Sequence, residues 1–104
     1  MTKEEIVSWI FLAIAIASEM KPTDYGGISQ IADGINHAVP THKEIQVSVN
    51  WLLVKNLILK NENKYTLSED GKKLFNKAQE KSRFLMGMWQ FLETEIINLN
   101  SEIA

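Results

Sequence analysis

The chain has 104 residues, of which 45% are hydrophobic, and this is enough for one domain with a core of its own. It contains no cysteine, so disulfides, zinc fingers and thiol chemistry are excluded. The net charge of −2 is unevenly distributed. Residues 1–42 hold two basic and five acidic side chains, and residues 43–83 hold nine basic and five acidic side chains. Residues 84–104 hold three acidic side chains and no basic one. The surplus of +4 in the middle segment is the sign expected of a surface that meets nucleic acid, and a solvated Lys-rich helix is the other interpretation.

A mostly apolar helix is predicted at the N-terminus. Thr2 and Glu5 have the spacing of a capping box, in which each side chain accepts the other residue's backbone N–H. From Ile6 to Ala17 the sequence is apolar almost all round, and such a helix must be covered on more than one side. We expect the C-terminal helix or a second subunit to supply this cover. The segment is shorter than the roughly 20 residues that span a bilayer, and it lacks the positive flank of a secretory signal, so a cytoplasmic protein without membrane contact is expected.

Two further helices follow, separated by a short turn. The first is predicted from about Ile28 to Asn36. The other begins at Thr41, which forms another capping box with Glu44, and it ends near Asn56, a residue type that tolerates the left-handed cap conformation. The apolar face of this later helix consists of Ile45, Val49, Leu52 and Leu53.

A hairpin and a long helix are predicted after these. Residues 57–59 form a short strand, residues 61–63 the turn and residues 64–67 the returning strand. Ser68 is the predicted N-cap of the last helix, because serine is a preferred N-cap residue. Acidic residues follow it in the first turn, where the helix dipole favours negative charge.

The last helix is predicted to continue to the C-terminus. Apolar residues recur at alternating spacings of three and four, broken only by one serine, and this is a heptad pattern. A helix of about 30 residues would be roughly 45 Å long, so its far end is expected to pair with a second copy of the chain. The alternative is a break near Gly87, after which the helix folds back on the first helix. The heptad positions are Phe75, Ala78, Ser82, Leu85, Trp89, Leu92, Ile96, Leu99 and Ile103.

The order and lengths of these elements resemble the winged helix-turn-helix domain. Two runs carry the resemblance, VNWLLVKNLI from Val49 to Ile58 and YTLSEDGKKL from Tyr65 to Leu74. The former resembles the end of a recognition helix, and the latter resembles the return strand of a wing followed by a helix start. Both runs are similar to segments that occur often in MarR-like and PadR-like bacterial repressors. The expected fold is therefore mainly α with a small β-hairpin wing: residues 1–80 form the winged helix-turn-helix domain, and residues 81–104 form the C-terminal part of a long amphipathic dimerisation helix.

The resemblance implies a sequence-specific DNA-binding transcriptional regulator that acts as a homodimer through the C-terminal helix and possibly the first helix. In the family, the third helix enters the major groove and the wing contacts phosphates of double-stranded DNA. Gln46 and Asn50 lie four residues apart, and each side chain can bind adenine with two hydrogen bonds. Carried onto this chain, the DNA-binding residues are Thr41, His42, Lys43, Gln46, Val47, Asn50, Lys60 and Lys64.

Two departures from the family pattern support an alternative function. The one arginine, Arg83, lies outside the third helix. Repressors of the family often place an arginine or lysine on that helix, and arginine is the side chain best suited to read guanine. Val47, Trp51 and Val54 form an apolar row beside the reading residues. Trp51 either packs beneath the wing or against the first helix, or it belongs to a protein-binding surface. The latter interpretation would make the chain a protein–protein interaction module without DNA binding.

Catalytic and metal-binding patterns are not evident in the sequence. No serine, histidine and acid arrangement or carboxylate pair suggests a reaction, so we expect neither an enzyme nor a cofactor. His37 and His42 lie near acidic residues, but those acids are better explained as helix surface and cap than as metal ligands.

Overall fold

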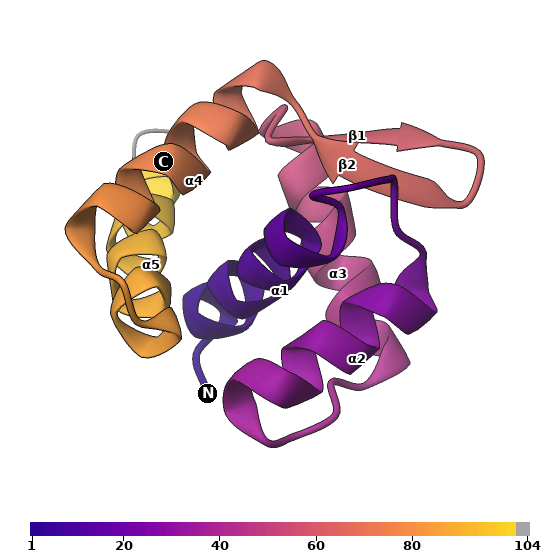
Figure 1. Cartoon of the computed structure of the whole chain (residues 1–104), viewed down its shortest axis with the longest axis horizontal. Helices are drawn as coiled ribbons and strands as arrows, with labels where there is room; N and C mark the ends of the chain where they lie inside the picture. Colours follow the sequence, from indigo (N-terminus) through magenta and orange to yellow (C-terminus); the bar gives the residue numbers. More distant parts are fainter. Residues whose placement is uncertain (102–104) are drawn as a thin grey trace.

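The structure, a computed structural model, describes residues 1–101, and these form five helices and one two-stranded antiparallel hairpin. The predicted class, mainly α with a small hairpin, is confirmed. Figure 1 shows α1 in the middle of the molecule, with the hairpin on one side and the last two helices on the other. In chain order the elements are α1 (Lys3–Ala17), α2 (Tyr25–Asn36), α3 (His42–Val54), β1 (Ile58–Asn61), β2 (Lys64–Leu67), α4 (Glu69–Lys81) and α5 (Leu85–Ser101).

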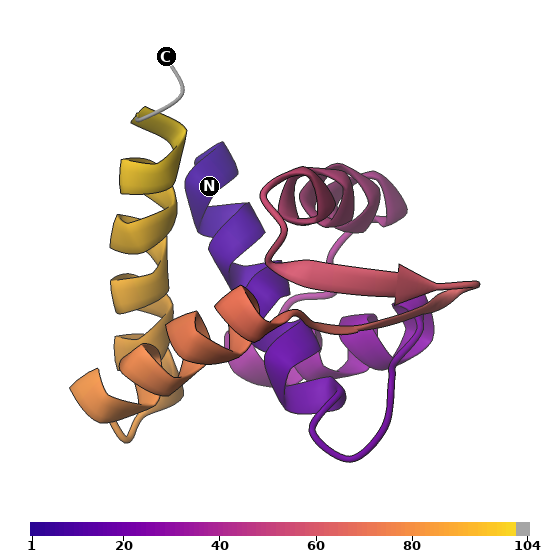
Figure 2. The ribbon, with the colours of Figure 1, turned by 90° about the horizontal axis from the view of Figure 1, so that it is seen from above.

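The central helix α1 begins at the predicted capping box. The N–H of Glu5 donates to Thr2 Oγ1 at 3.1 Å, and the N–H of Thr2 donates to Glu5 Oε1 at 3.0 Å. Every residue from Val7 to Ala15 is buried, because α2, α3 and α5 pack around the helix (Figures 1 and 2). The prediction of cover on several sides is confirmed. The suggestion that this helix also joins a dimer interface is wrong for these residues, since the chain itself covers them.

The helix α2 begins at Tyr25, before the predicted start at Ile28. The cause is Asp24, whose Oδ1 accepts the Gly27 N–H at 2.9 Å and so caps the first turn. The indole Nε1–H of Trp9 in α1 donates to the carbonyl oxygen of Ala32 at 2.9 Å. This hydrogen bond crosses the interface of the two helices and fixes their mutual position.

The hairpin follows the end of α3 directly. Asn56 has the predicted left-handed conformation, with φ of 60°. The strands pair with Ile58 opposite Leu67, and the returning strand has the predicted bounds. Ser68 caps α4 as predicted, accepting the Gly71 N–H at 3.0 Å, and its hydroxyl also donates to the Asn56 carbonyl oxygen at 2.6 Å. One serine therefore connects the end of α3 to the start of α4.

The C-terminal region consists of two helices, and the prediction of one continuous helix is wrong. Between Lys81 and Leu85 the chain leaves the helical conformation: Ser82 is extended, with φ of −155° and ψ of 145°, and its Oγ accepts the Phe84 N–H at 3.0 Å. The break is three residues long, close to the 3.6 residues of one helical turn. The heptad spacing of apolar residues in the sequence therefore looks the same with or without the break. Ile103, the last heptad position, lies outside the described residues.

The helix α5 folds back on α1, as the alternative prediction had it, although the break precedes Gly87. Trp89 Nε1–H donates to the Glu5 carbonyl oxygen at 2.9 Å and to Ser8 Oγ at 3.0 Å. Its ring stacks on Trp9, with 6.1 Å between centroids. The apolar side of α5 is thus buried within its own chain. Helix length therefore gives no reason to expect a dimer, because neither C-terminal helix has the predicted length.

Candidate nucleic-acid interface

The helix α3 has a buried side and a solvent side. Thr41 Oγ1 accepts the Glu44 N–H at 3.0 Å, and Glu44 Oε1 accepts the Thr41 N–H at 2.8 Å, so the predicted capping box sets the start of the helix. Ile45, Val49 and Leu52 are buried, and α3 packs on α1. The opposite side is exposed, and it carries all the predicted reading residues of the helix: Thr41, His42, Lys43, Gln46, Val47 and Asn50.

A polar cleft of about 510 Å³ separates the start of α3 from the hairpin. His42 of α3 lies on one wall, and Lys60 and Asn63 of the hairpin lie on the other. Tyr25, at the start of α2, lies between them: its ring centroid is 5.2 Å from that of His42 and 5.7 Å from that of Tyr65. The first turns of two helices and the hairpin therefore meet at one surface.

The hairpin is held in this place by the loop before α2. Thr23 N–H donates to the Tyr65 carbonyl oxygen at 2.9 Å, and Tyr65 N–H donates to the Thr23 carbonyl oxygen at 2.7 Å. This short bridge extends the pairing of the hairpin by one residue pair. Tyr25, Asn63 and Tyr65 were not among the predicted site residues, because no local sequence pattern signals a contact between the α2 loop and the hairpin.

The two predicted lysines of the hairpin differ in their surroundings. Lys64 Nζ lies 3.5 Å from Asp24 Oδ2, and both side chains are about half exposed. The Gly27 N–H and the Lys64 ammonium hold the pKa of Asp24 below its ordinary value, so this carboxylate stays charged beside the lysine. Lys60 is exposed and forms no ion pair among the described residues. Lys60 is therefore the freer of the two cations.

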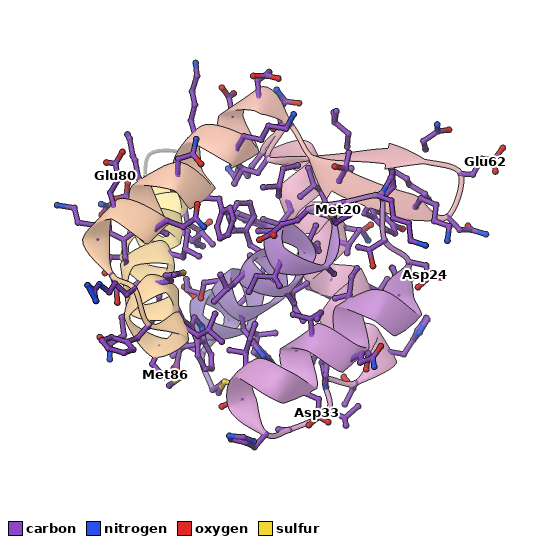
Figure 3. All side chains as sticks on the ribbon, viewed as in Figure 1. Met20, Asp24, Asp33, Glu62, Glu80 and Met86 are labelled. Atoms are coloured by element: carbon purple, nitrogen blue, oxygen red, sulfur yellow. The ribbon has the colours of Figure 1, made fainter. Side chains whose placement is uncertain are left out.

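The phenol of Tyr25 remains protonated near neutral pH. Burial, with a smaller effect of Tyr65, raises the pKa of Tyr25 above its ordinary value. A neutral phenol can donate a hydrogen bond to an anion in the cleft, whereas a phenolate would repel it. Figure 3 shows Glu62 at the tip of the hairpin and Asp24 at the start of α2. Asp24 lines the cleft, and Glu62, which precedes the lining residue Asn63 in the chain, is exposed.

Trp51 packs on the core, which is the structural interpretation offered by the sequence. It is half-buried, and it borders a small cavity together with Val7 of α1 and Ile96 of α5. Lys55 Nζ lies 5.4 Å from the centroid of its ring. A solvent-exposed Trp51, the mark of the protein-binding interpretation, is not observed. The exposed apolar residues of the row are Val47 and Val54, with exposed fractions of 41% and 82%.

Metal sites, membrane spans and known relatives give no further guide to this surface. Within residues 1–101, no group of three or more His, Asp or Glu side chains is placed to hold a metal ion. In the same part of the chain, no helix combines the length and apolar character that a membrane crossing requires. The chain matches no protein-family model, no curated protein and no solved structure. What the surface does must be inferred from its own geometry.

Proposed function

We propose that this chain is a sequence-specific DNA-binding transcriptional regulator of the winged helix-turn-helix type. The observation that carries the proposal is the exposed polar side of α3, which presents His42, Lys43, Gln46 and Asn50 to solvent and on which His42 lines a cleft bordered by the hairpin. Amide, ammonium and imidazole groups are the donors and acceptors that read base edges in the major groove. In this proposal α3 enters the major groove, and the hairpin acts as the wing.

The electrostatics of the cleft support contact with phosphates. The N-termini of α2 and α3 both lie there, and helix N-termini attract anions. Lys60 adds a free ammonium group, and the Tyr25 phenol adds a neutral donor. The carboxylates of Asp24 and Glu62 oppose this attraction. The net affinity for DNA therefore depends on how close these two carboxylates lie to the DNA phosphates when the hairpin is bound.

We also propose that the regulator is a homodimer joined through α5. No basic residue follows Arg83 in the sequence. Four large apolar side chains are exposed in the turn before α5 and on the solvent side of this helix: Phe84, Leu85, Met86 and Ile97. Met86 lies on the side of the molecule opposite Glu62 at the hairpin tip (Figure 3). One chain measures 29 × 28 × 26 Å, and binding to successive major grooves requires the dimer to hold its two α3 helices about 34 Å apart, one turn of DNA.

Charge variants of the hairpin test the proposal, with binding to a mixed-sequence duplex followed by fluorescence anisotropy at several salt concentrations. Lys60→Gln should weaken binding and reduce the salt slope by about 1, because one phosphate contact is lost. Glu62→Gln should strengthen binding about threefold at low salt, because an acid near phosphates is removed. The matched control is Glu80→Gln, since Glu80 lies on α4, away from the hairpin (Figure 3). Equal binding by all three variants and the parent would exclude the hairpin from the DNA contact.

The alternative function, a protein–protein interaction module, is favoured by one observation. Val54 is 82% exposed on the solvent side of α3, where a DNA-reading helix usually carries polar residues. The two functions differ in a simple respect. A protein-binding module would not bind DNA even at low salt, where phosphate contacts are strongest.

A further inference from the structure

The cleft between the start of α3 and the hairpin has an aromatic wall. Tyr25, His42 and Tyr65 each contribute a ring to its lining. The Tyr25 centroid lies 5.2 Å from that of His42 and 5.7 Å from that of Tyr65, so the three rings form a continuous row. The other lining residues are polar, charged or glycine, so the rings and the methylene stem of Lys60 supply the apolar surface. This lining suits a flat ring better than an aliphatic chain.

Two of the three rings are accessible from solvent. His42 is exposed and Tyr25 is partly exposed, whereas Tyr65 is only 5% exposed and lies behind Tyr25 in the row. The ring planes of His42 and Tyr25 are inclined by 55°, so these two rings are not stacked face to face. An inclined pair leaves ring surface uncovered, and a further aromatic ring can stack there.

Polar groups stand beside the rings. Asn63 lines the cleft and is exposed, and its carboxamide can both donate and accept hydrogen bonds. Lys60 lines it too, is exposed, and forms no ion pair among residues 1–101. The one acid of the lining, Asp24, is engaged: Oδ1 accepts the Gly27 N–H at 2.9 Å, and Oδ2 lies 3.5 Å from Lys64 Nζ. The cleft therefore presents an amide and a free ammonium group next to its rings.

We propose that this cleft binds one unpaired nucleotide. The base stacks on the rings of His42 and Tyr25, its polar edge meets the Asn63 carboxamide, and its phosphate meets the Lys60 ammonium group. Aromatic side chains beside basic ones are the usual means by which proteins hold unpaired bases. The volume of the cleft, about 510 Å³, is within the range of small-molecule sites. One nucleotide matches the rings, the amide and the cation together.

This site has a consequence for DNA recognition, and that consequence rests on the proposed function. His42 belongs to the predicted reading residues of α3, and Lys60 to those of the hairpin. A base displaced from a duplex held by both elements would enter the cleft between them. A duplex with one unpaired base should therefore bind at least about fivefold more tightly than the fully paired duplex, because the base is already free to stack.

The test is a titration of the isotope-labelled full chain without duplex DNA, observed by NMR at the ring protons of His42 and Tyr25. The probes are adenosine 5′-monophosphate (AMP), adenosine and ribose 5-phosphate. AMP should give saturable upfield shifts, because a stacked base shields the rings, with half-saturation below about 10 mM for a ligand of this size. Adenosine should bind at least about threefold more weakly, because it lacks the charge-assisted contact. Ribose 5-phosphate should give no upfield shift.

A single strand of deoxyadenosines distinguishes the two sources of such a nucleotide. If the nucleotide belongs to a strand, the oligonucleotide should bind at least about tenfold more tightly than AMP, because its neighbouring phosphates add contacts. Equal affinities would assign the cleft to a free mononucleotide. Saturable upfield shifts of the His42 and Tyr25 rings support the site in both cases.

Variants of the rings and the cation give the controls. His42→Ala, at an exposed position, and Tyr25→Leu should each weaken AMP at least about fivefold, and Tyr25→Phe should bind AMP at least about fivefold more tightly than Tyr25→Leu. Lys60→Gln should weaken AMP about threefold and bring it to the affinity of adenosine, whereas Lys81→Gln at the end of α4 should have no effect.

Two results would overturn the proposal: AMP shifts that do not saturate at the two rings, or equal AMP binding by the parent, His42→Ala and Tyr25→Leu. A separate titration with a fully paired duplex distinguishes this inference from the proposed function. Duplex binding without AMP binding overturns the nucleotide site alone. AMP binding without duplex binding supports the nucleotide site and contradicts the proposed function alone.

Discussion

In the proposed function, Gln46 and Asn50 are the side chains on which sequence reading by α3 depends. Both are exposed, so replacing them removes no core contact. Gln46→Ala and Asn50→Ala should each weaken binding to the preferred DNA site by about 1–3 kcal/mol, the value of one bidentate base contact. The free energy of unfolding, measured in urea, should stay within about 0.5 kcal/mol of the parent. Gln30→Ala on α2 is the control, and site affinities equal to the parent for both variants would mean that another surface reads the bases.

Gly71 is a residue whose lack of a side chain the fold requires. An added Cβ would collide with the backbone oxygen of Leu57, where the end of α3 meets the start of α4. Gly71→Ala should therefore lower the free energy of unfolding by about 1–3 kcal/mol. Gly34 in α2 has open space around it, so Gly34→Ala should raise the same quantity by about 0.5–1 kcal/mol through helix propensity. Urea denaturation of both variants measures the contrast, and a neutral Gly71→Ala would show that α4 does not start against Leu57.

Local interactions made single residues predictable from the sequence. The caps at Thr2, Thr41 and Ser68 and the left-handed Asn56 all arise within a few residues of chain, and each was predicted correctly. The wall of the cleft was not predictable in this way. Tyr25 and Tyr65 meet because the loop before α2 pairs with the hairpin, and nothing within either segment encodes that contact.

At the scale of elements, the break between α4 and α5 is a tertiary effect. The heptad pattern is satisfied equally by one helix and by two helices separated by about one turn, so periodicity does not distinguish them. The fold-back is favoured because Trp89 gains the Trp9 ring and two acceptors on α1, contacts that a straight helix could not make. Ser82 contributes locally by accepting the Phe84 N–H.

Substitution of Trp89 tests the docking of α5 on α1. Trp89→Ala removes a buried ring and leaves Ser8 Oγ without its indole donor, so the free energy of unfolding should fall by about 3–5 kcal/mol. Gln90→Ala, at the adjacent exposed position, should change it by less than about 0.5 kcal/mol. Chemical denaturation compares the two. If Trp89→Ala were as stable as the parent, α5 would not be docked in solution as the structure has it.

At the scale of the whole molecule, the proposed dimer depends on the solvent side of α5. Met86 and Ile97 are 52% and 43% exposed, so a charge at either position spares the core and opposes an apolar interface. Met86→Glu and Ile97→Glu should convert a dimer into a monomer in sedimentation velocity. Val54→Glu, on α3, should leave the dimer intact. A parent protein that sediments as a monomer at about 100 µM, a concentration far above the Kd of a stable dimer, would contradict the proposal.

The whole molecule also has a charge distribution that suits the proposed orientation on DNA. The segment with the +4 surplus includes most of α3, the hairpin and α4, whereas α5 carries acids only. A dimer joined at α5 would hold its least basic part away from the phosphates.

The most direct test of DNA reading is a selection of pooled genomic DNA fragments by the purified full chain at low and moderate salt, followed by sequencing. We expect retention at low salt and enrichment of a near-palindromic motif whose half-sites are about one helical turn apart. No retention at low salt, where phosphate contacts are strongest, would contradict DNA binding and favour the protein-interaction function instead.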